Sequence, residues 1–542
     1  MMEIENQGID YIFSDIVGGS GFAQWKIVFF GFFLNAAGGV PLFIHMFAAY
    51  TPSHRCKVPS CESYGNSSWM EWALPSSMGT SNFLQVNGAY DSCRMFKMKD
   101  VSSSCVPENF SNETIKCTEW VYDKTNYEYT ISTKYNLVCD SESKEKLLGT
   151  LMMIGLMFGS MIGGSVGDYF GRKVSCYTSI SITTCLLFLS SFVPSYEFYA
   201  TFVLLMCICL PVHWICAHSI LVEAFGVSGR ESCIAVKDTF APIYQSILGA
   251  LAYFFKPYYQ LHISVGTLGL IALSTAFFIP ESVRWDSVNG NSERAKKNLF
   301  KFAKENGKTL TEFEEKKIKD ILHKIYVEAK SSTNKGKHSF MDLFRNKELR
   351  ISLVLIANWI TVCFGAYTLS LNITNLYGNI FLNFVITGVV ELPASIVIYI
   401  ILKKFSRRFN LFLYQLITST CCVSLAIIPK TWSLTILVVF LIGLLSAGGG
   451  FVMVWLLPME LYPTNLRAQA LGTCSTIARF FSIGAGFLSI LSYYWKPLPL
   501  LIIGVPGFFA GLSAYLLPET AGMNLNELYH KENKKVIDIP KI

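Results

Sequence analysis

The sequence predicts an all-α membrane protein with twelve transmembrane helices in two six-helix pseudo-repeats and a large extracellular loop. Its composition, its hydrophobic pattern and a set of repeated helix-end motifs predict this fold. Hydrophobic residues make up 52% of the 542 residues and charged residues only 15%. A soluble protein carries about 25% charged residues, so this chain has too few to cover a water-exposed surface.

Twelve stretches of the chain are long and apolar enough to cross a membrane. A bilayer core needs roughly 20 apolar residues in each helix. The stretches are 25–50, 147–167, 174–193, 198–222, 233–255, 262–280, 351–371, 380–402, 411–429, 433–457, 468–495 and 498–517. Because acidic residues precede the first stretch, it predicts a membrane span and not a signal peptide.

Two polar segments divide these spans into two groups of six and set the domain boundaries. Charged residues four apart in the second of them, such as Glu312 and Lys316, predict short amphipathic helices there. The predicted parts are a cytosolic N-terminus 1–24, a first half 25–280 that includes the loop 51–146, a middle loop 281–350, a second half 351–517 and a cytosolic tail 518–542.

Basic residues in the loops predict the orientation in the membrane. The middle loop holds 17 basic and 11 acidic residues, whereas loop 51–146 holds 10 and 12. The short loops after the second and eighth spans also carry basic pairs, Arg172 with Lys173 and Arg407 with Arg408. Since cytoplasmic loops carry an excess of Lys and Arg, we expect these loops and both termini in the cytosol.

Loop 51–146 has the features of an extracellular segment. An even number of cysteines in one acidic loop predicts three disulfides, although six cysteines allow fifteen pairings and a set of unpaired thiols is the alternative. The six are Cys56, Cys61, Cys93, Cys105, Cys117 and Cys139. The same loop has sequons at Asn66, Asn109 and Asn112, which predict N-glycosylation.

The two halves repeat the same residues at corresponding helix ends. Parallel copies of one helical unit are typical of secondary transporters, whose substrate site lies near the midplane between the repeats. The matched residues are Glu223 and Arg230 with Glu460 and Arg467, and Pro280-Glu281-Ser282 with Pro518-Glu519-Thr520, at offsets of 237 and 238 residues.

Charged residues at these helix ends predict a gate. Carboxylates and guanidinium groups on neighbouring helices form charge-assisted pairs, and such pairs at cytosolic helix ends would hold that face of the bundle closed. The alternative is that they are interfacial charges with no part in gating. The candidates are Asp168, Arg172, Glu223, Arg230, Glu281, Arg284, Glu460, Arg467 and Glu519.

Several motifs together resemble those of a known family. They are Gly164-x-x-x-Asp168-x-x-Gly171-Arg172-Lys173, Pro280-Glu281-Ser282-Val283-Arg284-Trp285, Glu391-Leu392-Pro393-Ala394, Glu460-Leu461-Tyr462-Pro463-Thr464 with Arg467, and Leu517-Pro518-Glu519-Thr520. The first resembles a loop motif of the major facilitator superfamily. The set, with the cysteine-bearing loop, resembles the organic cation, organic anion and carnitine transporter family. The resemblance implies a major facilitator bundle at the plasma membrane that moves small amphipathic organic ions by facilitation or exchange.

Two charges inside predicted spans are candidates for substrate contact. A charge such as Arg479 at the centre of a span costs about 2.5–3.5 kcal/mol on insertion scales, so we expect it to face a cavity and bind a substrate carboxylate or sulfonate. The resemblance supports this role, because anion and carnitine members carry Arg at this place. Glu391 either pairs with Arg479 or contacts a cationic group, and Ser395 stands where anion members typically have Lys. The alternatives are a permanently paired Arg479 and a purely structural Glu391.

Polar and aromatic side chains are candidates to line the same cavity. Phe240 and Tyr244 are four residues apart and Phe364 and Tyr367 are three apart, so each pair shares one helix face. Asn35 in the first span is a polar candidate. An aromatic face can hold a quaternary ammonium or stack on an aromatic substrate, although most aromatic residues of membrane proteins serve packing or the interface.

The predicted function is polyspecific secondary transport, by uniport or exchange with alternating access, of small organic anions or zwitterions such as carnitine-like compounds. An organic cation transporter with Glu391 as the anchor and a receptor with a transporter fold are the alternatives. The sequence has no metal-ligand cluster, nucleophile triad, P-loop or dinucleotide fingerprint. We therefore expect that the protein is not an enzyme and that it has no cofactor and no nucleic-acid partner. The expected partners are a small organic ion, the lipid bilayer and a co-transported or exchanged ion.

Overall fold

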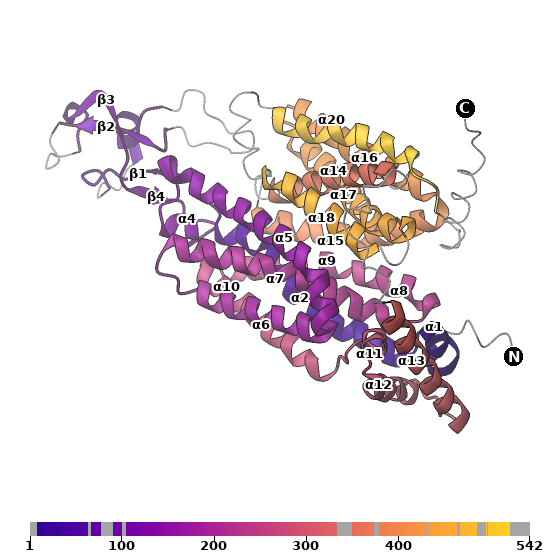
Figure 1. The fold of residues 1–542 in the computed structure, drawn as a ribbon. Helices are drawn as coiled ribbons and strands as arrows, with labels where there is room; N and C mark the ends of the chain where they lie inside the picture. Colours follow the sequence, from indigo (N-terminus) through magenta and orange to yellow (C-terminus); the bar gives the residue numbers. More distant parts are fainter. Residues whose placement is uncertain are drawn as a thin grey trace, which may run out of the picture.

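The computed structural model describes two bundles of long helices that lie side by side (Figure 1). The first bundle carries a small domain with β-strands at one end and a group of shorter helices at the other (Figure 1). The described residues are 8–62, 67–76, 90–99, 105–332, 349–372, 379–429, 431–462, 467–484, 495 and 497–520.

Each of the twelve predicted stretches contains helix, and ten of the helices in the described residues are long and apolar enough to cross a membrane. The first half has α2 Phe22–Ala48, α5 Glu142–Phe170, α6 Arg172–Ser190, α7 Tyr196–Glu223, α8 Val227–Asp238, α9 Phe240–Phe254 and α10 Tyr258–Ser274. The second half has α14 Leu349–Asn372, α15 Ile380–Lys404, α16 Arg407–Ile427, α17 Ser433–Leu461, α18 Arg467–Ser482 and α20 Leu498–Ser513.

The fifth predicted span differs from a single continuous helix. It is formed by α8 and α9, which meet at Thr239. Pro242 has no amide hydrogen and cannot bond the carbonyl of Asp238 four residues earlier, and the helix is interrupted at this point. In the eleventh predicted span, α18 accounts for the first part, and residues 485–494 lie outside the described part of the chain.

A small domain, here called the disulfide domain, comprises the described residues between Tyr50 and Ser141. Strand β1 His54–Cys56 pairs antiparallel with β4 Trp120–Tyr122, and β2 Arg94–Met98 pairs antiparallel with β3 Phe110–Lys116. Two short helices, α3 Met70–Ala73 and α4 Ile131–Lys134, complete it. The six cysteines form three bridges, Cys56–Cys117, Cys61–Cys105 and Cys93–Cys139, which confirms the predicted disulfides and selects one of the fifteen pairings.

The shorter helices at the other end of the first half come from the middle loop and the N-terminal segment. They are α11 Val283–Val288, α12 Ser292–Glu305, α13 Glu312–Ser332, α1 Ile9–Tyr11 and the π-helix Ile12–Gly18. Phe13 and Val17 of the N-terminal segment are fully buried in one core with Leu299 and Phe302 of α12. The N-terminal segment is therefore part of the folded first half and not a free tail.

The buried cores distinguish the two ends of the molecule. One apolar cluster, near the disulfide domain, includes residues of both halves, such as Phe47 of α2 and Phe384 of α15. Two other large clusters contain described residues of one half each. Across the boundary between the halves, α5 packs against α18 and α9 packs against α15. In the described residues, the halves thus share a buried core at the disulfide-domain end.

Candidate functional site

The first half carries a compact polar cluster where α5, α6, α7 and α10 end or begin. The Glu281 carboxylate, only 7% exposed, accepts hydrogen bonds from the backbone N–H of Lys173 (3.0 Å) and of Ser282 (2.9 Å). The Ser282 hydroxyl donates to Glu223. Arg172 forms ion pairs with Asp168 at 2.7 Å and with Glu223 at 3.6 Å. We call the side chains of Asp168, Arg172, Glu223, Glu281 and Ser282 the first-half cluster.

The second half repeats this arrangement with corresponding residues, here called the second-half cluster. Glu519 accepts hydrogen bonds from the backbone N–H of Arg407 (2.8 Å) and of Thr520 (3.2 Å). The Thr520 hydroxyl donates to Glu460, and Arg407 pairs with Glu460 at 3.7 Å. Arg408 adds an ion pair with Glu519 at 3.3 Å. The internal repeat seen in the sequence is therefore also a repeat of contacts.

Glycine at position 171 is required by the first-half cluster. Gly171 has a φ of 100°, a left-handed conformation that a residue with a Cβ rarely adopts. A Cβ at this position would also lie 2.6 Å from a carboxylate oxygen of Glu281. The glycine of the loop motif thus lets the chain turn between α5 and α6 while Glu281 approaches the start of α6.

The predicted gating residues in the first half do not pair with the other charged residue of their own helix-end motif. Glu223 pairs with Arg172, whereas Arg230 and Arg284 both pair with Asp10 of α1, at 2.6 and 2.5 Å. The side chain of Arg467 lies outside the described side chains. Asp10 was not a candidate in the sequence, because 220 residues separate it from Arg230 and its only signal is a charge beside an apolar run. Among the described residues, each ion pair joins two residues of the same half, and none connects the first half to the second.

Arg479 is buried, as its place in the eleventh span predicts. Its side chain is 5% exposed and its Nη1 donates to the Ser475 hydroxyl on the preceding turn of α18. Its Nε atom is buried without a hydrogen-bond partner in the described part of the chain. Helix α18 packs against α14 of the same half. The guanidinium therefore has no carboxylate partner among the described residues.

Glu391 lies on α15 and is not paired with Arg479 in this structure. The ion pairs of the described residues do not include its carboxylate, and the Ser395 hydroxyl bonds only its backbone carbonyl, at 3.0 Å. Helix α15 packs mainly against α9 of the first half. Two opposite charges are thus placed on helices of the second half without neutralising one another directly.

The aromatic and amide candidates are placed on α2, α9 and α14. The Tyr244 ring fills the space beside Gly39 of α2, where a Cβ would lie 2.2 Å from the Tyr244 Cζ atom. Phe240 contacts Phe32 edge-on at 5.3 Å between ring centroids, and the Asn35 amide donates to the Gly31 carbonyl at 2.7 Å. Phe364 is partly buried against the core shared by both halves. The side chain of Tyr367 is outside the described side chains.

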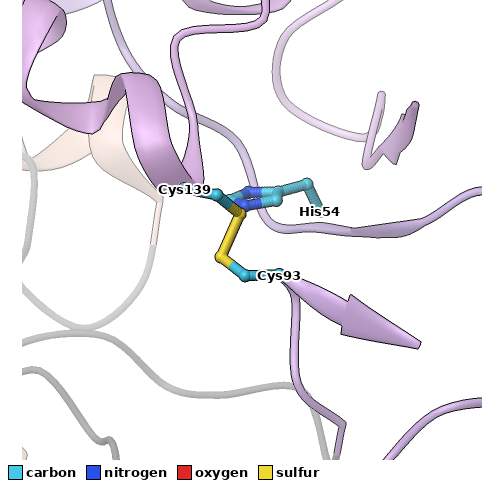
Figure 2. A group of neighbouring side chains, drawn as sticks. All are labelled: His54, Cys93 and Cys139. Atoms are coloured by element: carbon cyan, nitrogen blue, oxygen red, sulfur yellow. A yellow bond between two sulfur atoms is a disulfide. The ribbon is translucent and has the colours of Figure 1, made fainter. Parts of the chain in front are cut away.

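A group of possible metal ligands occurs in the disulfide domain. Figure 2 shows the His54 imidazole beside the bridge between Cys93 and Cys139. Their ligand atoms lie within 4.8 Å of one another. Because a cysteine binds metal as a thiolate, the two bridged sulfur atoms are not available as such ligands. We therefore interpret this group as a partly buried disulfide with a neighbouring imidazole.

We expect that intact protein has no free thiol among the six cysteines of the disulfide domain. Peptide mapping after denaturation and alkylation without reduction should recover all six as bridged pairs, while the free cysteines outside the domain, such as Cys185 and Cys209, serve as the labelled controls. Treatment with an N-glycosidase should raise gel mobility if Asn109 or Asn112 carries a glycan; Asn66 lies outside the described residues. Alkylation of any of the six cysteines before reduction would contradict the three bridges.

Comparison with known proteins agrees with this geometry. Residues 141–486, more than half of the chain, match the Major Facilitator Superfamily. The chain belongs to this superfamily. Within it, the chain is similar to the organic cation and carnitine transporters of solute carrier family 22.

This major facilitator protein is 27% identical to the human Organic cation/carnitine transporter 2, over 91% of this chain and 89% of that protein. It is 30% identical to Organic cation transporter 1 of Caenorhabditis elegans, over 75% of this chain and 69% of that protein. Among solved structures, the proton:xylose symporter XylE is similar with a TM-score of 0.63 at 14% identity, over 94% of this chain and 98% of that one. The predicted family and the major facilitator fold are thereby confirmed.

Proposed function

We propose that this major facilitator protein transports small organic anions or zwitterions by alternating access, with Arg479 as the anchor for the anionic group. The observation that carries the proposal is a buried guanidinium without a carboxylate partner among the described residues. An isolated buried cation is costly, and a substrate carboxylate or sulfonate would supply the missing charge. A planar guanidinium can bind such a group with two parallel hydrogen bonds.

Glu391 favours zwitterions within this substrate class. The Glu391 carboxylate of α15, which has no ion-pair partner in the described part of the chain, provides a second, opposite charge that a cationic group of the substrate would neutralise. A carnitine-like betaine carries both required charges on one small molecule. In this proposal, the rings of Tyr244, Phe240, Phe364 and Tyr367 and the amide of Asn35 line the cavity, where aromatic faces accommodate a quaternary ammonium group.

The second candidate is transport of organic cations with Glu391 as the sole anchor. The names of several relatives, such as Organic cation transporter 1, favour it. Arg479 distinguishes the two candidate functions, because a cavity that holds a buried guanidinium repels a substrate with only positive charge. We therefore rank anions and zwitterions above cations.

For the membrane setting, we propose the plasma membrane, with the disulfide domain outside the cell and both termini in the cytosol. Bridged cysteines require an oxidising compartment, and the basic α11–α13 region and the basic turn before α16 agree with a cytosolic location. The two polar clusters lie at the cytosolic helix ends in this orientation, where they keep each half rigid while the halves move. A co-transported or exchanged ion belongs to the proposal without an assigned site.

The test is competition uptake in proteoliposomes with three molecules of matched size. These are a trimethylammonium butyrate betaine, the corresponding fatty acid without the nitrogen, and an alkyl trimethylammonium ion without the carboxylate. We expect the betaine to compete best, the acid to compete and the cation to compete weakly. Preference for the cation would favour the second candidate, and absence of flux for all three would contradict organic-ion transport.

A further inference from the structure

The halves meet near the disulfide domain through a group of stacked aromatic rings. Phe47 of α2 lies parallel to Phe381 of α15, with 5.8 Å between ring centroids, and edge-on to Phe384 at 5.0 Å. Phe43, one turn earlier on α2, also contacts Phe384 at 6.2 Å. Phe47, Phe381 and Phe384 are each at most 3% exposed. These rings close the boundary between the halves at this end.

Tyr127 adds a ring from the disulfide domain to this group. It is 4% exposed, stacks on Tyr50 at 4.6 Å and contacts Phe381 at 5.3 Å between ring centroids. Its hydroxyl group is buried and has no hydrogen-bond partner in the described residues. Burial raises the pKa of Tyr127 well above its ordinary value, because a phenolate would lose its hydration, so the hydroxyl stays neutral.

The segment that carries Tyr127 is attached to the first half. Tyr129, two residues later, accepts a backbone hydrogen bond from Tyr258 of α10 at 2.9 Å. The Ser132 hydroxyl donates to the Ala49 carbonyl at 2.7 Å, and Lys134 donates to the Tyr258 hydroxyl at 2.8 Å. Tyr127 is therefore fixed to the first half, and its contact with Phe381 crosses to the second half.

We propose that the disulfide domain takes part in transport by supplying Tyr127 as a residue of the extracellular gate. The domain moves with the first half, and the Tyr127–Phe381 contact forms when the outside is closed and breaks when it opens. This inference rests on the alternating-access transport proposed above, and it adds a gating role for a domain outside the membrane.

Tyrosine has two opposing effects at this position. The ring contact with Phe381 stabilises the closed state, as packed aromatic pairs do. The unpaired hydroxyl destabilises the same state, because a buried donor without a partner has lost its bonds to water. When the halves part, water reaches the hydroxyl. Removing the whole ring and removing only the hydroxyl should therefore shift the gate in opposite directions.

The experiment measures labelling of an engineered cysteine from outside intact cells. Ser246 of α9 faces Gly388 of α15, where a Cβ would lie 2.3 Å from the Ser246 hydroxyl oxygen, so Ser246→Cys is a small change at the boundary between the halves. A membrane-impermeant methanethiosulfonate reagent reports how often this position is reached from outside. Protein with Ser246 intact gives the background from the native cysteines.

Tyr127→Ala should raise the labelling rate of the Ser246→Cys reporter roughly 3- to 10-fold, since one aromatic contact with the second half is lost. Tyr127→Phe should lower the rate, since the contact remains and the unpaired hydroxyl is gone. Tyr129→Ala is the matched control on the same segment, because the Tyr129 ring is exposed and lies at a tilt against Tyr258 of the first half. This substitution should leave the rate unchanged.

Equal labelling in the Tyr127→Ala and Tyr129→Ala variants, or a Tyr127→Phe rate at or above that of the unchanged protein, would overturn the proposal. The conservative Phe variant keeps the test decisive if the Ala variant does not reach the cell surface. Labelling needs no substrate, so the gate and the proposed function can fail separately. Shifted labelling without organic-anion uptake would retain the gate and reject only the substrate class.

Discussion

Arg479→Ala should abolish uptake of carboxylate-bearing substrates while the protein still reaches the cell surface. A hydrogen-bonded charge contributes about 1.5–3 kcal/mol, so uptake efficiency should fall about 10- to 150-fold for each lost bond of this kind. Uptake of betaines and acids should fall, whereas uptake of an alkyl trimethylammonium ion should not fall, because the repulsion by the guanidinium is removed. Initial uptake rates, normalised to surface protein, measure it.

Arg479→Lys is the matched variant for this test. It retains the charge but loses the planar fork that binds a carboxylate with two bonds, so partial activity is expected. Stability separates a substrate anchor from a permanently paired Arg. If Arg479 were permanently paired with a carboxylate, Arg479→Ala would leave that carboxylate buried and unpaired and would destabilise the fold. If Arg479 is instead a substrate anchor without such a partner, the alanine variant should be as stable as the unchanged protein. Undiminished carboxylate uptake by Arg479→Ala would remove this residue from the site.

The hydrophobic pattern predicts the membrane helices well because insertion in a bilayer depends mainly on apolar length. It does not show where the helix of the fifth span is interrupted, although Lys237, Asp238 and Pro242 lie around the break. It also misses the fold of residues 9–18, although the spacing of Ile12, Phe13, Ile16 and Val17 matches one buried helical face. That signal is short, and its partner α12 lies almost 300 residues further along the chain.

Burial of Arg479 could be predicted from one residue, because the cost of a charge in a span depends on local position. The absence of a pair with Glu391 could not, because it depends on how α15 and α18 pack. The helix-end motifs likewise predict charged clusters but not their partners. Glu223 contacts Arg172 and Ser282, and Glu460 contacts Arg407 and Thr520. The partners in each contact are 50 to 60 residues apart in the chain, so the motifs alone do not identify them.

Glu460→Gln should lower both the stability of the second half and the transport rate. The substitution keeps an acceptor for the Thr520 hydroxyl but removes the charge opposite Arg407, and both partners of that pair are about 20% exposed. A hydrogen bond to a charged group contributes about 1.5–3 kcal/mol and one to a neutral group about 0.5–1.5 kcal/mol. Loss of the charge should therefore cost about 1 kcal/mol in the Thr520 bond, in addition to the lost attraction to Arg407, and lower the midpoint of thermal unfolding in detergent by a few degrees. Glu223→Gln should have a similar effect, because its contacts with Ser282 and Arg172 match those of Glu460.

Glu113→Gln is the matched control for these two variants. Glu113 pairs with Lys97 on the exposed surface of the disulfide domain, and such pairs contribute only about 0–1 kcal/mol. Accessibility of a cytosolic-side cysteine then separates two roles for the clusters. Pairs that brace one half, as their geometry indicates, predict lower stability with unchanged accessibility, whereas pairs that hold the two halves together predict increased accessibility. If Glu223→Gln and Glu460→Gln leave stability, flux and accessibility at the level of the control, both roles fail and these residues are interfacial charges.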